Sequence, residues 1–206
     1  MGNEGRCPMT PDAPGQRRGG LVIISGPSGV GKSSICAALL DRLPGAVWSV
    51  SVTTRPQRPG DVPGQTYEFV SEEEFQRRSA AGHFLEEAVY CGHRYGTPKA
   101  PVEAAIRDGR VVVMEIDVQG AIQAAARMPD SFRIFILPPT PESLRARLEG
   151  RRTEGEEALA RRLAKADGEI AIARDSGCYH HFVVNDDLES TIQRVLDIIT
   201  QETSSA

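Results

Sequence analysis

Long hydrophobic runs, paired cysteines and a large excess of one charge are all missing from this sequence of 206 residues. No stretch of about 18 consecutive apolar residues occurs, so we expect no membrane-spanning helix and no membrane partner. The 24 Lys and Arg residues are balanced by 28 Asp and Glu, which gives a formal net charge of −4. Nucleic-acid-binding domains are usually basic, so we expect no nucleic-acid partner and only local anion sites.

Cysteine is scarce and scattered along the chain. The four cysteines (Cys7, Cys36, Cys91 and Cys178) form no C-x-x-C pair and have no histidine at ligand spacing. This spacing argues against a zinc site. Together with the lack of a recognisable signal peptide, it indicates reduced thiols, and we predict a cytoplasmic location.

The rest of the composition is that of a folded domain. Hydrophobic residues make up 40% and charged residues 25%, which excludes a wholly disordered chain. A chain of this length buries roughly 70% of its unfolded surface, enough for one domain with a small insert. Residues 1–19 are rich in Gly and Pro and poor in apolar groups, so we predict a disordered tail there and frayed ends at 204–206.

Between the tails, apolar β-branched runs alternate with helical stretches. Strands are predicted over 21–25, 110–117, 132–137 and 181–184, and helices over 32–42, 121–127, 141–172 and 188–200, with a polar break at 150–155. Strands separated by helices predict right-handed βαβ units. The expected fold class is therefore α/β, a three-layer core around a parallel sheet.

Residues 47–97 interrupt this alternation. They read as a strand, a loop rich in Pro and Gly, a strand (67–70), a helix and a strand (84–90). Ser71 and Glu74 have the spacing of a capping box for that helix. We predict a small mixed α/β insert over 47–97 within a domain that spans 20–202.

Residues 26–33 match G-x-x-x-x-G-K-[ST], between a predicted strand and a predicted helix. Glycines let successive backbone N–H groups wrap an anion, and the helix N-terminus adds partial positive charge. Lys32 would reach the β- and γ-phosphates, and the Ser33 hydroxyl could bind Mg²⁺. The pattern predicts a Mg-nucleoside triphosphate site; a glycine turn that merely joins strand to helix is the alternative. The residues expected to bind ATP are Gly26, Pro27, Ser28, Gly29, Val30, Gly31, Lys32, Ser33 and Ser34.

A second anion site is suggested further along. Arg55 and Arg58 lie close together on the predicted loop, with Tyr67 downstream. Planar guanidinium forks suit phosphate, and a phenolic hydroxyl adds a donor. Loop arginines are also common on plain solvated surface, so the spacing alone leaves both interpretations open.

The stretch from Thr53 to Phe69 fills every position of T-[ST]-R-x-x-[KR]-x-x-[DE]-x-x-G-x-x-Y-x-[FY]. Further ordered matches are FLE at 84–86, YGT at 95–97, EIDVQG at 115–120, ILPP at 136–139, RLEGR at 147–151, RRL at 161–163 and VNDD at 184–187. With the phosphate loop, these motifs resemble the guanylate kinase family, which transfers a phosphoryl group from ATP to GMP. The resemblance covers all but the tails.

The resemblance implies that the insert binds GMP. Arg55, Arg58, Tyr67 and Tyr95 would hold the GMP phosphate, and Ser51, Glu86 and Thr97 would read guanine. The chemistry agrees, because guanine presents N1–H and N2–H₂ side by side to one carboxylate, whereas adenine would leave that carboxylate unpaired. Without the resemblance, a surface carboxylate on a strand would be the favoured interpretation of Glu86.

Two acids lie near the carboxyl end of the strand predicted over 110–117. Asp117 lies at its end, where α/β sheets bind ligands. The resemblance places Asp117 between GMP and the waters of a metal ion that Ser33 holds; an Asp that caps the next helix is the alternative. Glu115 occupies a position where the family more often has Asp, and we leave it out of the predicted site.

The resemblance also implies a helical lid over 141–165, which leaves 20–46, 98–140 and 166–202 as the core. Arg147, Arg151 and Arg162 match lid arginines that stabilise charge on the transferred phosphoryl group, and with Lys32 they form the expected catalytic set. Solvated helix faces are the alternative for these arginines. Arg152 departs from the family, which usually has Gly there.

The implied reaction is ATP + GMP ⇌ ADP + GDP in purine nucleotide metabolism, with dGMP as a further acceptor and Mg²⁺ as cofactor. No general base is needed, because the acceptor oxygen is already anionic at neutral pH. No obligate protein partner is expected. Two alternatives stay open: a kinase for another phosphorylated acceptor such as a ribosyl bisphosphate, and a non-enzymatic scaffold domain, against which the intact phosphate loop argues.

Overall fold

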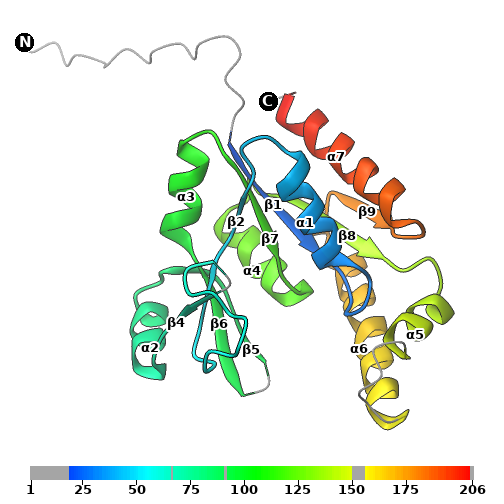
Figure 1. Cartoon of the computed structure of the whole chain (residues 1–206), viewed down its shortest axis with the longest axis horizontal. Coiled ribbons are helices and arrows are strands. Elements are labelled where there is room, and N and C mark those ends of the chain that lie inside the picture. The colour runs from blue at the N-terminus through cyan, green and yellow to red at the C-terminus, as the bar shows by residue number, and fades with distance from the viewer. Residues whose placement is uncertain (1–18, 66, 91, 150–155, 205–206) are drawn as a thin grey trace, which may run out of the picture.

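The computed structural model describes residues 19–65, 67–90, 92–149 and 156–204 (Figure 1). Of the segments predicted above, the tail over 1–18, the break at 150–155 and residues 205–206 lie outside the described residues. The strands are β1 Gly20–Ser25, β2 Val47–Trp48, β3 Ser51–Thr53, β4 Tyr67–Phe69, β5 Phe84–Tyr90, β6 His93–Pro98, β7 Val111–Glu115, β8 Phe132–Leu137 and β9 His181–Val184. The helices are α1 Lys32–Arg42, α2 Glu72–Ala80, α3 Lys99–Arg107, α4 Val118–Arg127, α5 Pro141–Glu149, α6 Glu156–Asp175 and α7 Leu188–Ser204.

A five-stranded parallel sheet forms the centre of the molecule, in the order β2-β7-β1-β8-β9. The predicted α/β fold with a parallel sheet is confirmed. β1 is the middle strand, and its residues Leu21 to Ile24 are buried on both faces. That burial explains why its sequence is a continuous apolar run without alternation.

Helices cover both faces of this sheet. On one face, α1 and α7 pack through Ile35, Leu39 and Val195. On the other face, α3, α4 and α6 contribute a second core that includes Val102 and Ala121. The two cores make the predicted three layers.

The insert contains a separate four-stranded mixed sheet in the order β4-β3-β6-β5. β3 pairs parallel to β4 and antiparallel to β6. α2 covers this sheet through Phe75, whose ring stacks on Phe84 at 4.7 Å between centroids. Ser71 caps α2 as predicted, since its Oγ accepts a hydrogen bond from the Glu74 amide at 3.1 Å.

The structure differs from the sequence expectation around the insert. Val47 and Trp48 pair with β7 in the central sheet, and the insert sheet begins only at Ser51. β6 and α3 were not predicted, because the polar His93-Arg94 start of β6 and the Pro101 in the first turn of α3 obscure the local periodicity. The tertiary partners β3 and β5 hold β6 in place.

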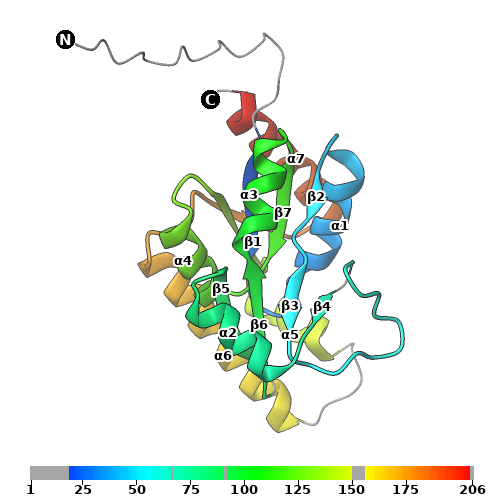
Figure 2. The same cartoon turned by 90° about the vertical axis from the view of Figure 1, so that its left-hand side faces the viewer.

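The insert and the α5–α6 pair lie at the same end of the molecule, beyond the carboxyl ends of β1 and β7 (Figures 1 and 2). α5 and α6 share a small core of Leu144, Leu148 and Ala166. This arrangement leaves the phosphate loop after β1 between the two outer bodies.

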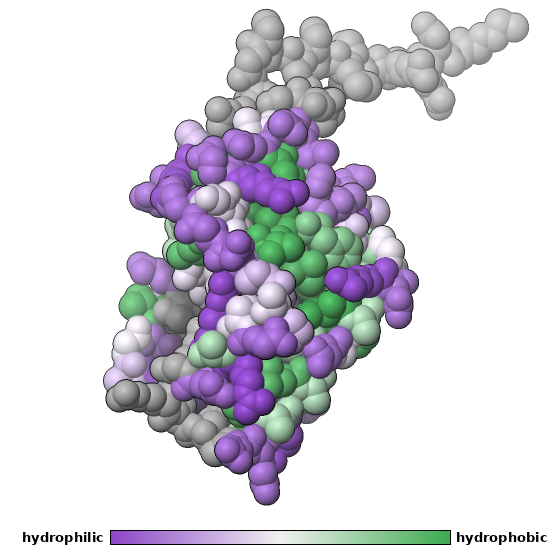
Figure 3. Space-filling model, turned by 90° about the vertical axis from the view of Figure 1, so that its right-hand side faces the viewer, coloured by the Kyte–Doolittle hydropathy of each residue, from purple (hydrophilic) through white to green (hydrophobic). Residues whose placement is uncertain are grey.

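Figure 3 shows the side of the molecule where β9 is the edge strand, with apolar residues down the middle of the face. On β9 and at the start of α7, the exposed large apolar side chains are Phe182, Val184 and Leu188. Within the described ranges, no helix is long and apolar enough to cross a bilayer.

Candidate functional site

The phosphate loop follows β1 and leads directly into α1. Within it, Lys32 Nζ donates hydrogen bonds to the carbonyl oxygens of Gly26 (2.7 Å) and Pro27 (3.1 Å), so its ammonium group lies across the loop. Burial lowers the pKa of Lys32, and the nearby Glu115 carboxylate opposes that effect. The predicted ATP-binding segment therefore folds as a loop with its lysine directed inward.

Gly31 is the N-cap of α1 and has a left-handed backbone, with φ of 101°. Of the described residues, no side chain caps this helix end and no acidic residue stands in its first turn. The amides of the first turn are therefore available to an anion. A Cβ at Gly31 would lie 2.6 Å from Asn185 Nδ2, which itself donates to the Val30 carbonyl at 2.7 Å.

A Gly31→Ala substitution tests this packing. The left-handed backbone costs a non-glycine residue about 1–2 kcal/mol, and the added methyl group would also displace Asn185 from the loop. We expect a lower melting temperature and at least a tenfold higher KM for ATP, measured by thermal unfolding and steady-state kinetics. Gly45→Ala is the matched control, because Gly45 has φ of 79° with no atom within 4 Å of the added Cβ. An unchanged KM for ATP in Gly31→Ala would contradict the role of this contact.

Acidic oxygens face the loop from the end of β7. Ser33 Oγ donates to Glu115 Oε1 at 3.0 Å. Glu115 and Asp117 line the same cavity of about 300 Å³ as the glycines of the loop and Lys32. Glu115, left out of the predicted site, thus belongs to it by position. The sequence could have indicated this, because Glu115 lies two residues before Asp117 and residues two apart in a strand point to the same face.

Asp117 also caps α4, since its Oδ1 accepts from the Gly120 amide at 2.9 Å. The capping alternative considered for Asp117 is therefore observed. It coexists with the placement of Asp117 in the cavity wall.

In the insert, Arg55 is a buried cation, with 7% of its surface exposed. Its Nη2 lies 3.0 Å from Asp61 Oδ2, and its guanidinium lies 5.4 Å from the centre of the Tyr67 ring. Tyr67 in turn contacts Tyr95, with 5.8 Å between ring centroids. Three of the four predicted phosphate ligands are thus brought together.

Asp61 organises this cluster and was not singled out from the sequence. Its Oδ2 accepts from the Arg58 amide at 2.7 Å, while the Arg58 side chain is exposed to solvent. The hydrogen bond from the Arg58 amide lowers the pKa of Asp61, and the contact with Arg55 adds to this effect. The sequence did contain a signal for this role, because Asp61 fills the acidic position of the motif that begins with T-[ST]-R.

Glu86 is buried, with 4% of its surface exposed, so it is not a surface carboxylate. Thr97 Oγ1 donates to Glu86 Oε1 at 2.7 Å, and Ser51 Oγ lies 3.4 Å from Thr97 Oγ1. The three residues predicted to read guanine therefore form one cluster. Burial raises the pKa of Glu86 to about 7. A Cβ at Gly120 would lie 3.1 Å from Glu86 Oε2, so a larger residue there would require this carboxylate to shift by a few tenths of an ångström from its place against α4.

Of the predicted lid arginines, Arg162 contacts the phosphate loop directly, and Arg147 contacts a residue that packs against the loop. Arg162 Nη2 donates to Ser28 Oγ at 2.9 Å, and Arg147 Nη2 donates to the Asn185 carbonyl at 2.9 Å. Arg151, Arg152 and the hinge around them lie outside the described residues. Asn185, which links Arg147 to the loop, was recognised from the sequence only as part of a motif.

Lys165 and Glu169 of α6 complete the cavity wall, and neither was predicted. Lys165 Nζ lies 5.8 Å from the centre of the Tyr90 ring, at the end of β5. A contact therefore joins α6 to the insert across the mouth of the phosphate loop. Among the described residues, no group of three or more His, Cys, Asp and Glu side chains is placed to hold a metal ion by itself.

A phosphate loop with an inward-directed lysine, a separate arginine-containing insert and arginines from a third helical body define a P-loop phosphotransferase with a dedicated acceptor site. The family described as guanylate kinase matches residues 18–202. The chain belongs to the guanylate kinase family.

Known proteins resemble it over most of their length. The guanylate kinase of Symbiobacterium thermophilum is 46% identical over 189 residues, which is 92% of this chain and 88% of that protein. The guanylate kinase of Rubrobacter xylanophilus is 46% identical over 183 residues, covering 89% of this chain and 94% of that protein. The crystal structure of guanylate kinase from Anaplasma phagocytophilum superposes with a TM-score of 0.71 at 33% identity, over 91% of this chain and 88% of the other.

Proposed function

We propose that this chain carries out the family reaction, ATP + GMP ⇌ ADP + GDP, with the residues described above. The observation that carries the proposal is the buried Glu86–Thr97–Ser51 cluster in the same insert as the buried Arg55. One carboxylate can accept both N1–H and N2–H₂ of guanine, and the Arg55–Tyr67–Tyr95 group suits the phosphate of the same nucleotide. Arg58 lies beside this group on the same loop and supplies a second guanidinium.

ATP would bind at the phosphate loop. The loop amides between Gly26 and Ser34 surround its phosphates, and Lys32 exchanges its bonds to loop carbonyls for bonds to the β- and γ-phosphates. Arg162 already contacts the loop, and Arg147 contacts the neighbouring Asn185; both would stabilise charge on the transferring group, and we assign Arg151 the same role from its position in the motif.

The residues present also suit Mg²⁺. Ser33 Oγ, Glu115 and Asp117 offer only oxygen donors, the ligands that Mg²⁺ prefers, and Mg²⁺ usually takes one or two protein ligands beside the phosphates of its nucleotide. Ser33 would bind the ion directly, and Asp117 would do so through water. When bound, the ion neutralises phosphate charge during transfer.

Catalysis then depends on positioning and on excluding water. The acceptor phosphate is already anionic, so no side chain needs to remove a proton. Arg55 and Arg58 on one side, with Lys32 and the lid arginines on the other, hold two mutually repelling anions in line. We infer that the insert (51–97) and the lid (141–165) close over the core when both nucleotides bind, because an open site would hydrolyse ATP.

A coupled assay of ADP release with GMP, dGMP, AMP, UMP and ribose bisphosphate tests the proposal. We expect turnover with GMP and dGMP and at least about 100-fold lower kcat/KM with AMP, since adenine leaves Glu86 unpaired. Equal rates with AMP and GMP would contradict the guanine-reading cluster. Turnover with ribose bisphosphate alone would point to a different acceptor, and no turnover at all to a scaffold.

The pKa of Glu86 predicts a pH effect on GMP use. Only the deprotonated carboxylate accepts both guanine donors, and burial raises its pKa to about 7 in the free protein. Protonation of Glu86 therefore removes GMP affinity as the pH falls, and kcat/KM for GMP should fall about tenfold per unit below pH 7.

Glu86→Gln is the control for this profile, because the phosphate group of GMP titrates nearby, with a second pKa of about 6. The variant should have a lower kcat/KM at pH 8 and should lose the inflection near pH 7 while it keeps the one near pH 6. The same two inflections in both proteins would show that Glu86 is not the titrating group.

For the surroundings of the enzyme, we propose a cytoplasmic location and small-molecule partners only, namely ATP and GMP. The charge balance and the separation of Cys36 from Cys178 support this proposal.

A further inference from the structure

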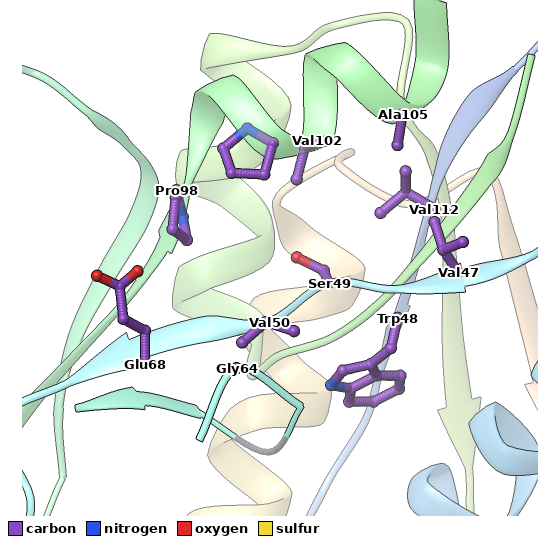
Figure 4. A pocket seen from close by; sticks show the side chains of 11 residues that line it. Val47, Trp48, Ser49, Val50, Gly64, Glu68, Pro98, Val102, Ala105 and Val112 are labelled. Carbon is purple, nitrogen blue, oxygen red and sulfur yellow. The ribbon is translucent and has the colours of Figure 1, made fainter. Parts of the chain in front are cut away.

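A second cavity lies where the insert joins the core, away from the phosphate loop. It has a volume of about 410 Å³, and its walls are mostly apolar, with Val47, Val102, Ala105 and Val112 among them. Figure 4 shows these side chains around a space between the first turns of α3 and the chain that leaves β2. None of the residues assigned to ATP or GMP lines this cavity.

The cavity lies directly behind the GMP site. Three residues of its wall are direct sequence neighbours of residues assigned to GMP. Val50 precedes Ser51, Glu68 follows Tyr67, and Pro98 follows Thr97. Successive residues of a strand point to opposite faces of a sheet. One thickness of the insert sheet therefore separates the two sites.

Both connections between the insert sheet and the core border this cavity. Ser49 and Val50 join β2 of the central sheet to β3 of the insert, and Pro98 ends β6 where α3 of the core begins. Any movement of the insert relative to the core bends these two connections. The shape of the cavity is therefore tied to the position of the insert.

One buried polar group points into this space. Ser49 has 7% of its surface exposed, and its Oγ has no hydrogen-bond partner among the described residues. Its backbone is fixed, because the Ser49 amide donates to the Val113 carbonyl at 3.0 Å. Figure 4 shows the hydroxyl directed toward the space below Val102. A buried hydroxyl without a partner is unfavourable by about 1–3 kcal/mol, which a bound donor or acceptor would relieve.

We propose that this hinge cavity, defined by Val47, Ser49, Val50, Pro98, Val102 and Ala105, is a second ligand site. Its ligand class is a compact, uncharged, mostly apolar molecule with one hydrogen-bonding group, such as a phenol, bound to Ser49 Oγ. Among the described residues, no cationic side chain lines the cavity, and its one charged group, the Glu68 carboxylate, is already paired with Arg78 at 2.7 Å, so an anionic nucleotide does not suit this site. An occupant stabilises the present hinge geometry and so opposes closure of the insert over GMP.

The binding test uses 4-fluorophenol and the full chain. Fluorine NMR should show saturable binding with a Kd on the order of 1 mM, the affinity that a ligand of this size can reach. Trp48 lines the cavity and is the only tryptophan, so its fluorescence should change over the same concentration range. Ala105→Leu, which fills the cavity, should weaken binding at least fivefold, and Ser49→Ala should weaken it as well.

Ala104→Leu is the matched control, since it makes the same change one residue away on α3, outside the cavity wall. Melting curves of each variant establish that it is folded. Non-saturating binding, or equal binding to Ala105→Leu and Ala104→Leu, would overturn the site. Either result would leave the proposed kinase reaction untouched.

The kinetic test addresses the hinge. At saturating 4-fluorophenol, the KM for GMP should rise at least threefold while the KM for ATP stays unchanged, because the residues assigned to ATP lie outside the insert. The Ala105→Leu variant should lose this effect. Saturable binding without any change in the KM for GMP would overturn the coupling between cavity and insert.

Discussion

Replacing Lys32 with Ala should lower kcat by about 1,000-fold or more while GMP still binds with its normal affinity. Lys32 is the cation placed inside the phosphate loop, where it bonds to the Gly26 and Pro27 carbonyls. In the reaction it would neutralise charge that develops between the β- and γ-phosphates, and the loss of such a group removes stabilisation specific to the transition state. Steady-state kinetics and equilibrium titration with GMP separate the two effects.

Lys99→Ala is the matched control for this variant. Lys99 lies on α3 and is half-exposed, with its Nζ 3.6 Å from Glu103, and such surface pairs contribute about 0–1 kcal/mol. Its kinetics should equal those of the unchanged protein. A Lys32→Ala protein that keeps more than a tenth of the normal rate would contradict the role assigned to Lys32.

Replacing Arg55 with Lys should lower kcat/KM for GMP by about 100- to 1,000-fold. Arg55 is buried and presents a planar fork between Asp61 and the Tyr67 ring, and a lysine keeps the charge but loses the bidentate geometry. Each hydrogen bond to a charged group contributes about 1.5–3 kcal/mol; two are lost and the lysine ammonium restores part of one, so the net loss is about 3–4 kcal/mol. The effect should fall on the KM for GMP, with the KM for ATP unchanged.

Arg42→Lys provides the comparison for Arg55. Arg42 also donates two hydrogen bonds to one carboxylate, that of Glu189, but it lies on the surface of the core at the end of α1. We expect no change in either KM from it. If Arg55→Lys keeps its KM for GMP within threefold of the normal value, the phosphate of GMP binds elsewhere.

Several features were readable from the sequence because they depend on neighbours along the chain. The phosphate loop is one, since a strand, the spaced glycines and a helix are contiguous and dictate a backbone that wraps anions. The Ser71 cap of α2 is another, because it joins residues only three apart. The buried parallel strands follow from short apolar runs between helices.

Contacts between distant segments were not readable in this way. β6 depends on pairing with β3 and β5, and its own residues have little strand character. Asp61 acquires its importance from the burial of Arg55, and Lys165 from the approach of α6 to Tyr90 across the site. Glu115 was set aside because the family more often has Asp there, and the sequence does not reveal that its carboxylate lies 3.0 Å from the Ser33 hydroxyl.

The sequence by itself determined the class of the protein and its phosphate loop, because those properties are encoded in local spacing and residue chemistry, and its motifs predicted which residues face each nucleotide. Only the tertiary structure decided the charge state and shielding of those residues, such as the raised pKa of Glu86 to about 7. It also created the hinge cavity behind the GMP site. Burial and desolvation arise when separate segments pack together, and no single segment contains that information.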